Sequence, residues 1–515
     1  MATITYAKGL RDYAFLGDYF QPNDAAAVKS ETPTQFRYAN ADGTTVTVTG
    51  TGFTYLGGIP VDGEINTIEV KQGTKVLLTF TGVDQELTGF YYNAFGWDQG
   101  NGNRQNGDGF NTLSDLFGGN DKLVGSAEAD DFTVGHNEGN DTILAKGGDD
   151  YIDGSRGNDS IDGGDGYDAL AFSNTHFGGA GVLHGLILDL AAGTLTDPWG
   201  DTDKVLNVEE FQGSKLSDVI RGTPGDDNFM GLRGADTIDG RGAPDTDYDI
   251  VRYDRDFDFG GLRGIIADFL KDTVRDGFGT TDIVKNVEEI RGTRFADTFI
   301  GGGKGETNFV GLDGADKYQG AGSTFDSIDL SGGDQSIVVD MTRSTGQIRN
   351  DGFGNVETYT GDINAFFAGG ANDTLTGNTK ANFLSGQRGD DRISGGGGDD
   401  QVRGGEGDDT LTGGAGKDEF QWRRDSDGFG KDVITDFKHG EDDVGFRFRD
   451  FAGMDDTVRF NVGTKATHAG SSFFFNTATD TLSWDRDGTG SAFDAVKVVI
   501  LTGLSTFTAG DLFLH

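Results

Sequence analysis

The feature that most constrains the fold of this chain is a nine-residue period of acidic residues. Residues 386–420 read GQRGDDRIS, GGGGDDQVR, GGEGDDTLT and GGAGKDEF, so an aspartate returns every nine residues, in most units with an apolar residue two positions later. A flexible linker rich in Gly and Asp has no reason to keep such a register. The period therefore predicts stacked structural repeats, a solenoid, as the body of the chain.

Four blocks of the chain follow this register. Their register positions hold Asp121, Asp130, Asp141, Asp150, Asp159 and Asp168, then Asp218, Asp227 and Asp236, then Asp297, Thr307 and Asp316, and finally Asp373, Asn382, Asp391, Asp400, Asp409 and Asp418. Each unit approximates G-G-x-G-x-D-x-U-x, in which U is apolar. Glycines, among them Gly395, Gly396, Gly397 and Gly398, allow the first six residues to turn tightly. The last three residues form a short strand with one inward apolar residue, such as Ile393.

Stacking of these units predicts cation sites. Two units make one turn of a parallel β-helix, which brings each aspartate over the aspartate 18 residues further on. Stacked like charges repel each other unless a cation lies between them. Carboxylate and carbonyl oxygens are hard ligands that select Ca²⁺. The sequence therefore predicts an all-β fold, a right-handed parallel β-helix or β-roll with β caps at both ends, that binds roughly a dozen Ca²⁺ ions.

Charge and composition exclude several classes of partner. The chain of 515 residues has 85 Asp and Glu against 42 Lys and Arg, a net charge of −43. Because nucleic acids are bound by neutralising phosphates with Lys and Arg, we expect no nucleic-acid partner, and anionic lipid is disfavoured for the same reason. No Cys is present, which excludes disulfides and Cys-ligated metal centres. No apolar stretch approaches the roughly 18 residues of a membrane span.

These units resemble the RTX nonapeptide repeats of Gram-negative proteins exported by type I secretion, which fold as calcium-loaded parallel β-rolls. The resemblance covers roughly residues 118–420. It implies that each Ca²⁺ takes two backbone carbonyls and the Asp carboxylate from one loop, and the same set from the loop two units on. It also implies an extracellular or cell-surface location in a Gram-negative bacterium, with the type I secretion machinery as a partner.

Carried onto this chain, the resemblance implies specific ligand sets. One site would use Gln387, Gly389 and Asp391 with Gly404, Glu406 and Asp409, and the next Gly396, Gly398 and Asp400 with Gly413, Ala415 and Asp418. In the first block the sets are Asn137, Gly139 and Asp141 with Gly154, Arg156 and Asp159, and Lys146, Gly148 and Asp150 with Gly163, Asp165 and Asp168. Asn382 should weaken the site that it shares with Asp400, and Thr307 removes a carboxylate. The extra residues Val134 and Gly135 interrupt the register of the first block.

Similar connectors separate the nonapeptide blocks. They span 186–214, 265–293 and 337–362, and each contains a tetrad that begins with Asp197, Asp276 or Asp351. Alternating apolar residues in them predict strands that line the core, within plain β-helix turns. The acids Asp189, Glu209 and Glu210 allow two interpretations, a carboxylate pair for glycoside hydrolysis or solvated loop acids and extra Ca²⁺ ligands. Recurrence of these acids in the connectors favours the second.

The predicted organisation follows from these blocks. It comprises an N-terminal β cap or binding module (1–117), a first repeat block (118–171), a connector (172–217), two blocks with connectors (218–296 and 297–367), a fourth block (368–420), and a C-terminal cap (421–515). The C-terminal segment resembles that of RTX proteins such as serralysins, which implies an uncleaved type I secretion signal. Residues 1–10 contain no long apolar run, so we expect no cleavable secretory signal. The aromatic cluster between Phe90 and Trp97 could be a sugar-stacking platform or core filling.

No catalytic motif accompanies the repeats. None of the six histidines is followed by Glu, so the H-E-x-x-H zinc motif is absent, and no Ser lies in G-x-S-x-G. We therefore expect a non-enzymatic calcium-binding protein of the cell surface or matrix, as in a surface layer or biofilm, that associates with itself or with envelope or extracellular polysaccharide. A glycan-binding adhesin and a β-helix polysaccharide-modifying enzyme are the alternatives.

Overall fold

The computed structural model describes residues 3–6, 30–39, 44–56, 59–86, 120–132, 139–172, 184–242, 247–302, 307–322, 326–423, 430–447, 459–490 and 494–514. The chain divides into two compact units, Met1–Asp249 and Ile250–His515. In the described residues the regular elements are β-strands and short 3₁₀ turns, η2 (Asp256–Phe259) and η4 (Ala509–Asp511). The predicted all-β class is therefore confirmed. Within these residues no helix is long and apolar enough to cross a membrane.

An antiparallel sheet precedes the repeats in the first unit. It contains β1 (Thr3–Tyr6), β2 (Ser30–Thr32), β3 (Gln35–Ala39), β4 (Thr44–Leu56), β5 (Ile59–Gln72) and β6 (Lys75–Glu86). Alternating residues such as Val46, Val48 and Val70 are fully buried, as expected for strands with one covered face. Strand β1 pairs antiparallel with β6 and parallel with β7 (Lys122–Val124), the first repeat strand. The sheet thus joins the first turn of the solenoid.

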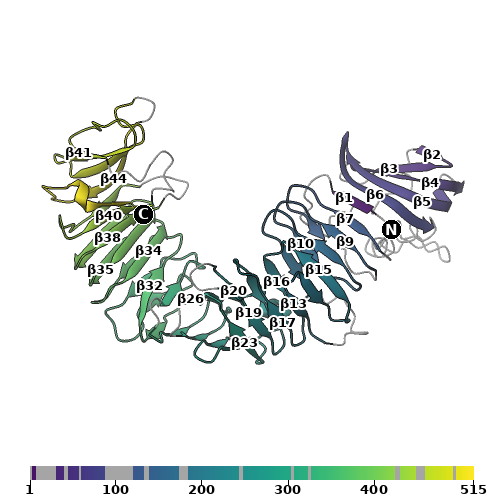
Figure 1. The fold of residues 1–515 in the computed structure, drawn as a ribbon, viewed down its shortest axis with the longest axis horizontal. Helices are drawn as coiled ribbons and strands as arrows, with labels where there is room; N and C mark the ends of the chain where they lie inside the picture. Colours follow the sequence, from purple (N-terminus) through teal and green to yellow (C-terminus); the bar gives the residue numbers. More distant parts are fainter. Residues whose placement is uncertain are drawn as a thin grey trace. The chain divides into compact units, whose positions relative to one another are not determined.

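Two parallel ladders form the solenoid of the first unit, and successive strands in the nonapeptide turns alternate between them (Figure 1). One ladder contains β7, β9 (Thr142–Leu144), β11 (Ser160–Asp162) and β15 (Thr202–Leu206). After the antiparallel strand β14 (Thr194–Thr196) it continues with β13 (Ile187–Asp189), β17 (Val219–Arg221) and β19 (Thr237–Asp239). The other contains β8 (Asp131–Phe132), β10 (Tyr151–Asp153), β12 (Ala169–Ala171), β16 (Glu210–Gln212) and β18 (Asn228–Met230). Ile143 pairs with Ile161 and Ile152 with Leu170. All four side chains are at most 3% exposed, so the predicted inward apolar residues form the core.

The second unit continues the same construction. One ladder holds β20 (Ile250–Arg252), β24 (Glu289–Arg291), β26 (Thr307–Val310), β28 (Asp326–Asp329), β32 (Ile363–Phe367), β34 (Phe383–Arg388), β36 (Gln401–Glu406), β38 (Glu419–Trp422), β40 (Asp443–Phe446) and β45 (Leu512–Leu514). Facing strands include β21 (Ile266–Asp268), β25 (Thr298–Ile300), β27 (Lys317–Gln319) and β31 (Thr358–Thr360). Later ones are β29 (Val338–Asp340), β33 (Thr374–Thr376), β35 (Arg392–Gly397), β37 (Thr410–Ala415) and β39 (Asp432–Ile434). Figure 1 labels β32, β34, β38 and β40 of the first of these ladders, in which β36 lies between β34 and β38.

The connectors differ from the plain β-helix turns that the sequence predicts. In the first, β14 (Thr194–Thr196) pairs antiparallel with both β13 and β15. In the second, β22 (Thr273–Arg275) pairs in the same way with β21 and β23 (Thr281–Lys285). In the third, β30 (Ile348–Asn350) pairs antiparallel with β29. Each connector therefore reverses the chain locally before the parallel ladder resumes.

The C-terminal strands close both ladders of the second unit. Strands β42 (Ser472–Asn476), β43 (Thr481–Asp485) and β44 (Val496–Leu501) form an antiparallel meander, and β41 (Phe460–Val462) pairs parallel with β42. Strand β44 then extends the ladder beside β39, and β45 extends the other beside β40. The predicted closing segment 432–444 spans β39 and the start of β40.

Candidate calcium-binding ladders

The predicted aspartates stack along the solenoid and are joined by hydrogen bonds. In each pair, a side-chain oxygen accepts the backbone N–H of the register residue one turn earlier. The distances are 2.7 Å for Asp121 to Asp141, 2.6 Å for Asp130 to Asp150, 2.7 Å for Asp141 to Asp159, 2.9 Å for Asp150 to Asp168, 2.8 Å for Asp218 to Asp236, 2.7 Å for Asp297 to Asp316, 2.7 Å for Asp373 to Asp391, 2.8 Å for Asn382 to Asp400, 2.8 Å for Asp391 to Asp409 and 3.1 Å for Asp400 to Asp418. The extra residues 134–135 lie outside the described residues. The two pairs that span them, Asp121 with Asp141 and Asp130 with Asp150, keep this hydrogen bond.

The second carboxylate oxygen faces the carbonyl groups of the stacked loops. In Asp150, Asp168, Asp391, Asp400, Asp409 and Asp418 this oxygen is buried and has no hydrogen-bond partner among the described residues. A Cβ on Gly386 would lie 2.0 Å from Asp391 Oδ2 and 2.7 Å from the Gly404 carbonyl oxygen. One small space is therefore bordered by a carboxylate of one loop and a carbonyl of the next. An all-oxygen cradle of this kind suits Ca²⁺.

The predicted carbonyl ligands point to the loop 18 residues further on. Carbonyl oxygens of Gln387, Gly389, Gly396 and Gly398 approach the Cβ positions of Gly405, Gly407, Gly414 and Gly416 within 1.9–2.2 Å. In the first block, Gly139, Lys146 and Gly148 face Gly157, Gly164 and Gly166 within 1.7–2.3 Å. Asn137 lies outside the described residues. These carbonyls therefore lie against the loop one turn further on, and the complete ligand sets stay a prediction.

Burial of these carboxylates raises their pKa values. The pKa is about 8 for Asp391, about 7 for Asp141, Asp150 and Asp400, and about 6 for Asp159, Asp168, Asp409 and Asp418. Desolvation is the largest cause in each, and neighbouring acids add to it. A bound cation would favour the charged form and remove this penalty.

Some register aspartates receive further hydrogen bonds from the start of their own loop, as Asp159 does from the Ser155 hydroxyl at 2.9 Å. Asp218 accepts from the amide and hydroxyl of Ser214, at 2.7 Å each, and from the amide of Leu186 at 2.7 Å. Thr223 caps Asp227 and Thr293 caps Asp297 in the same way. Asp373, in the fourth block, is held by the amides of Ile337 and Gly369. These carboxylates already have protein donors, and calcium binding by them stays a prediction.

Two register positions carry no carboxylate. The Asn382 side-chain oxygen accepts the Asn378 amide at 2.8 Å, so the amide side chain completes the loop without a charge. Thr307 is buried in β26 and pairs in register with Asp326. Both positions keep the fold of the repeat while lowering the number of negative ligands.

Several ladder acids were missed by the nine-residue period. The side chains of Asp203, Glu209, Asp249, Glu357, Asp432 and Asp442 accept the backbone N–H of Asp159, Asp168, Asp227, Asp316, Asp409 and Asp418 at 2.8–3.3 Å. Each lies two residues before a buried apolar or aromatic residue, such as Val205 or Phe211. That local signal is the one found in the repeats, but separations of 22 to 44 residues hide it from a search by period.

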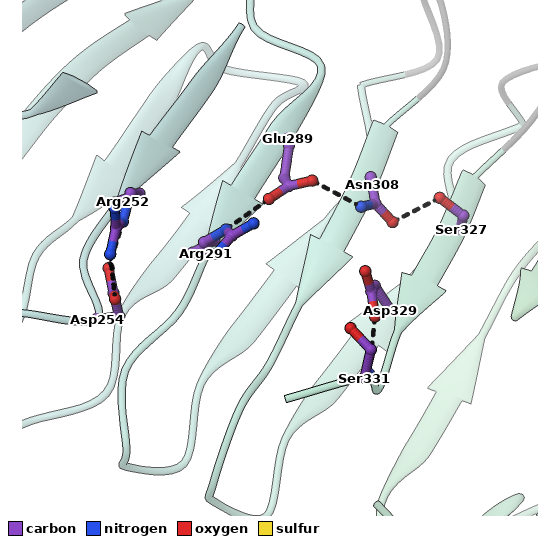
Figure 2. Close-up of polar contacts among 8 residues, drawn as sticks. All are labelled: Arg252, Asp254, Glu289, Arg291, Asn308, Ser327, Asp329 and Ser331. Atoms are coloured by element: carbon purple, nitrogen blue, oxygen red, sulfur yellow. Dashed lines mark hydrogen bonds and ion pairs between the residues drawn. The ribbon is translucent and has the colours of Figure 1, made fainter. Parts of the chain in front are cut away.

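The connector acids have structural partners. Glu209 belongs to the ladder, and Asp189 forms an ion pair with Arg241 at 2.7 Å. Glu289, the second-connector counterpart of Glu210, contacts Arg291 at 2.6 Å and Asn308 at 2.9 Å on the outer face of the sheet (Figure 2). Their contacts favour the structural interpretation of these acids.

No three acidic or histidine side chains of the described chain segments converge on a single metal position. Calcium sites in the repeats therefore require backbone carbonyls together with the paired aspartates. This ligand type is the one that the glycine-bordered loops provide.

Comparison with known protein families gives four matches to the RTX calcium-binding nonapeptide repeat. They cover residues 137–170, 212–247, 367–402 and 394–420, mostly in the first, second and fourth predicted blocks. No curated protein matches the chain. The third block, which is not matched, keeps the same ladder bond between Asp297 and Asp316. The chain carries RTX-type calcium-binding nonapeptide repeats, and its described residues fold as a parallel β-roll.

Proposed function

We propose that this protein is exported unfolded and folds when it meets extracellular Ca²⁺. On this proposal it then serves as a non-enzymatic structural component of the surface or matrix of a Gram-negative bacterium. The observation that carries the proposal is the stack of buried aspartates whose second oxygens have no protein partner in the described loops, as in Asp391 and Asp409. Such a stack is stable only when positive charge neutralises it.

Calcium-dependent folding follows from this charge distribution. At −43, the chain repels itself, which disfavours a compact state. Ions that bind only the folded loops stabilise them by mass action. Roughly a dozen Ca²⁺ ions, one for each stacked pair of loops, would cancel about 24 negative charges. Extracellular modules bind Ca²⁺ at roughly 0.1–1 mM, so the same ions would be bound outside the cell and absent inside it.

Type I export suits a chain of this kind. The resemblance of residues 421–515 to RTX C-terminal regions supports it, and a chain without Cys passes through a channel without disulfide constraints. The proposed partners are the secretion machinery and Ca²⁺ itself.

The structural role rests on the repetition of the solenoid. Its connector acids cap turns or belong to the ladder, and RTX repeat regions are typically non-enzymatic. The glycan-binding alternative depends on the Phe90–Trp97 cluster, which lies outside the described residues.

Electron microscopy tests the structural role. The full chain would be imaged at millimolar Ca²⁺, alone and with isolated cell envelope, and in chelator as the control. We expect extended assemblies or a decorated envelope only with Ca²⁺. Dispersed monomers under every condition would contradict the surface or matrix role while leaving calcium-dependent folding intact.

A further inference from the structure

The three connectors share one turn, built around a buried aspartate. Asp197 Oδ1 accepts the backbone N–H groups of three successive residues, 199–201, at 3.0, 2.8 and 2.8 Å. Asp276 and Asp351 bind the equivalent amides at 2.7–3.1 Å. All three carboxylates are at most 1% exposed. One oxygen of each carboxylate therefore holds the turn. The three connectors differ in the hydrogen-bond partners of the second carboxylate oxygen.

Protein donors satisfy that second oxygen in two connectors but not in the first. The Thr280 hydroxyl donates to Asp276 Oδ2, and the Asn355 amide donates to Asp351 Oδ2 at 2.9 Å. The equivalent residue in the first connector is Asp201, whose carboxylate has no proton to donate. Asp197 Oδ2 is accordingly buried with no hydrogen-bond partner among the described residues.

The ladder acid of the first connector shows the same deficit. Tyr253 donates its hydroxyl to Asp282, the counterpart of Asp203 in the second connector, at 3.0 Å. Tyr318 donates to Glu357, the ladder acid of the third connector, at 3.3 Å. In the first connector the ladder acid is Asp203, and the position of Tyr318 is taken by the apolar Ile161. Asp203 Oδ2 is buried without a partner in the described part of the chain.

These two oxygens belong to one charged cluster. The Asp159 amide donates to Asp203 Oδ1 at 2.8 Å, and Arg156 lies over the Trp199 ring, 5.2 Å from its centroid. The repeat loop that contains Arg156 and Asp159 therefore lies against the connector turn. Thr196 pairs with Thr202 across β14 and β15, and the Asp197 N–H donates to the Asp201 carbonyl at 3.1 Å. One hairpin therefore carries Asp197, Asp201 and Asp203.

We propose that the first connector binds an additional divalent cation, with Ca²⁺ the preferred ion, through Asp197 and Asp203. Asp201 adds negative charge, and backbone carbonyls or water complete the oxygen shell. Such an ion would hold the reversed connector against the last repeat turn of the first block. In the other connectors, hydrogen bonds from Thr280, Asn355, Tyr253 and Tyr318 satisfy the equivalent carboxylates. The proposal deepens the calcium dependence proposed above and is independent of the role at the cell surface.

Terbium luminescence tests this site, because Trp199 lies in the turn and can sensitise a bound Tb³⁺. Emission would be measured in the full chain, in Trp199→Phe, in Asp201→Thr and in the double variant. The Thr substitution copies the second connector. We expect Trp199→Phe and Asp201→Thr each to remove the same share of emission, and the double variant to lose no more than either. In Asp203→Asn, the emission that depends on Trp199 should require a Tb³⁺ concentration about tenfold higher or more, because the site loses a charged ligand.

Glu357→Gln is the matched control, since it alters the ladder acid of the third connector, where Tyr318 already donates. Its Trp199-dependent emission should equal that of the parent chain. Unchanged Trp199-dependent emission in both Asp201→Thr and Asp203→Asn would overturn the proposal. Counting bound Ca²⁺ in the native-tryptophan chain gives a second measure, with one ion fewer expected in Asp201→Thr and an equal count contradicting the site. A chain that fails to fold with Ca²⁺ at all would instead contradict the proposed function.

Discussion

At the scale of single residues, the RTX aspartates fall into two groups that their shared motif does not separate. Asp391 and Asp409 keep a buried oxygen without a partner in the described chain, whereas Asp218 and Asp297 receive amide and hydroxyl bonds from Ser214 and Thr293. A Ser or Thr four residues before the aspartate marks the second group. The distinction predicts which aspartates depend on calcium.

Replacing Asp391 with Asn should raise the Ca²⁺ concentration needed for folding by about tenfold, because the site loses one of its two charged ligands. The amide oxygen can still accept the Asp373 amide, so the ladder bond is kept. Calcium titration followed by circular dichroism measures the change. Asp218→Asn is the matched control and should shift the midpoint far less. Equal shifts in the two variants would refute the division.

The first position of a repeat unit requires glycine, because the aspartate carboxylate of that unit lies where a larger side chain would begin. A Cβ on Gly404 would lie 2.1 Å from Asp409 Oδ2, whereas one on Gly370 meets nothing within 4 Å. Gly404→Ala should therefore abolish one calcium site, and Gly370→Ala should leave the ion count unchanged. Calcium counting after equilibrium dialysis compares them. Full occupancy in Gly404→Ala would show that the carboxylate is placed elsewhere.

Protonation of the buried ladder aspartates should partly stabilise the metal-free fold, because it removes their negative charge as bound calcium would. The pKa of Asp391 rises to about 8 and that of Asp150 to about 7 in the folded chain, above the ordinary value of 3.8, chiefly through burial. Raised values mean that the folded state binds more protons, so metal-free stability is greatest below about pH 4 and falls as pH rises to about 8. Calcium-free circular dichroism should show more β structure at pH 5 than at pH 8. Loss of β signal on acidification would contradict this sign.

At the scale of elements, each repeat strand contributes one inward residue to a narrow core. Leu411 lies in β37, is fully buried, and pairs with Ile393 and Ile434. Its neighbour Thr412 bonds Thr435 on the exposed outer face. The strands are too short to be stable alone, so this stacked core and the ladder bonds hold them together.

Leu411→Ala should lower the free energy of unfolding in Ca²⁺ by about 2–5 kcal/mol, because it leaves a cavity between two stacked turns. Thr412→Ala, on the outer face, should change it by less than about 1 kcal/mol. Chemical denaturation at fixed Ca²⁺ measures both. Similar losses for the two variants would argue against an inward Leu411.

Much of the element order could be predicted from the sequence, because glycine positions and the residue two after each aspartate specify a loop and a strand. The reversal at β14 and β22 could not, since alternating apolar residues indicate a strand but not its direction. Asp432 and Asp442 were not predicted as ladder acids, because their spacing from the other ladder aspartates departs from nine residues. The connector turns became clear only from the three amides bound by Asp197, Asp276 and Asp351.

At the scale of the whole molecule, folding and calcium binding are one process in this account. Each ion neutralises stacked acids that otherwise oppose folding, and stability is distributed over many similar interfaces between neighbouring turns. The protein's environment would then determine whether it is folded, through the Ca²⁺ concentration. The residues that set this response are the ladder acids rather than the core.

The most direct test is a Ca²⁺ titration of the full chain that records β structure by circular dichroism and counts bound ions in the same samples. We expect the chain to lack ordered β structure in chelator at pH 8, and to gain it cooperatively as roughly a dozen ions bind. A full β spectrum without Ca²⁺, unchanged as ions are added, would contradict the claim that calcium completes the fold.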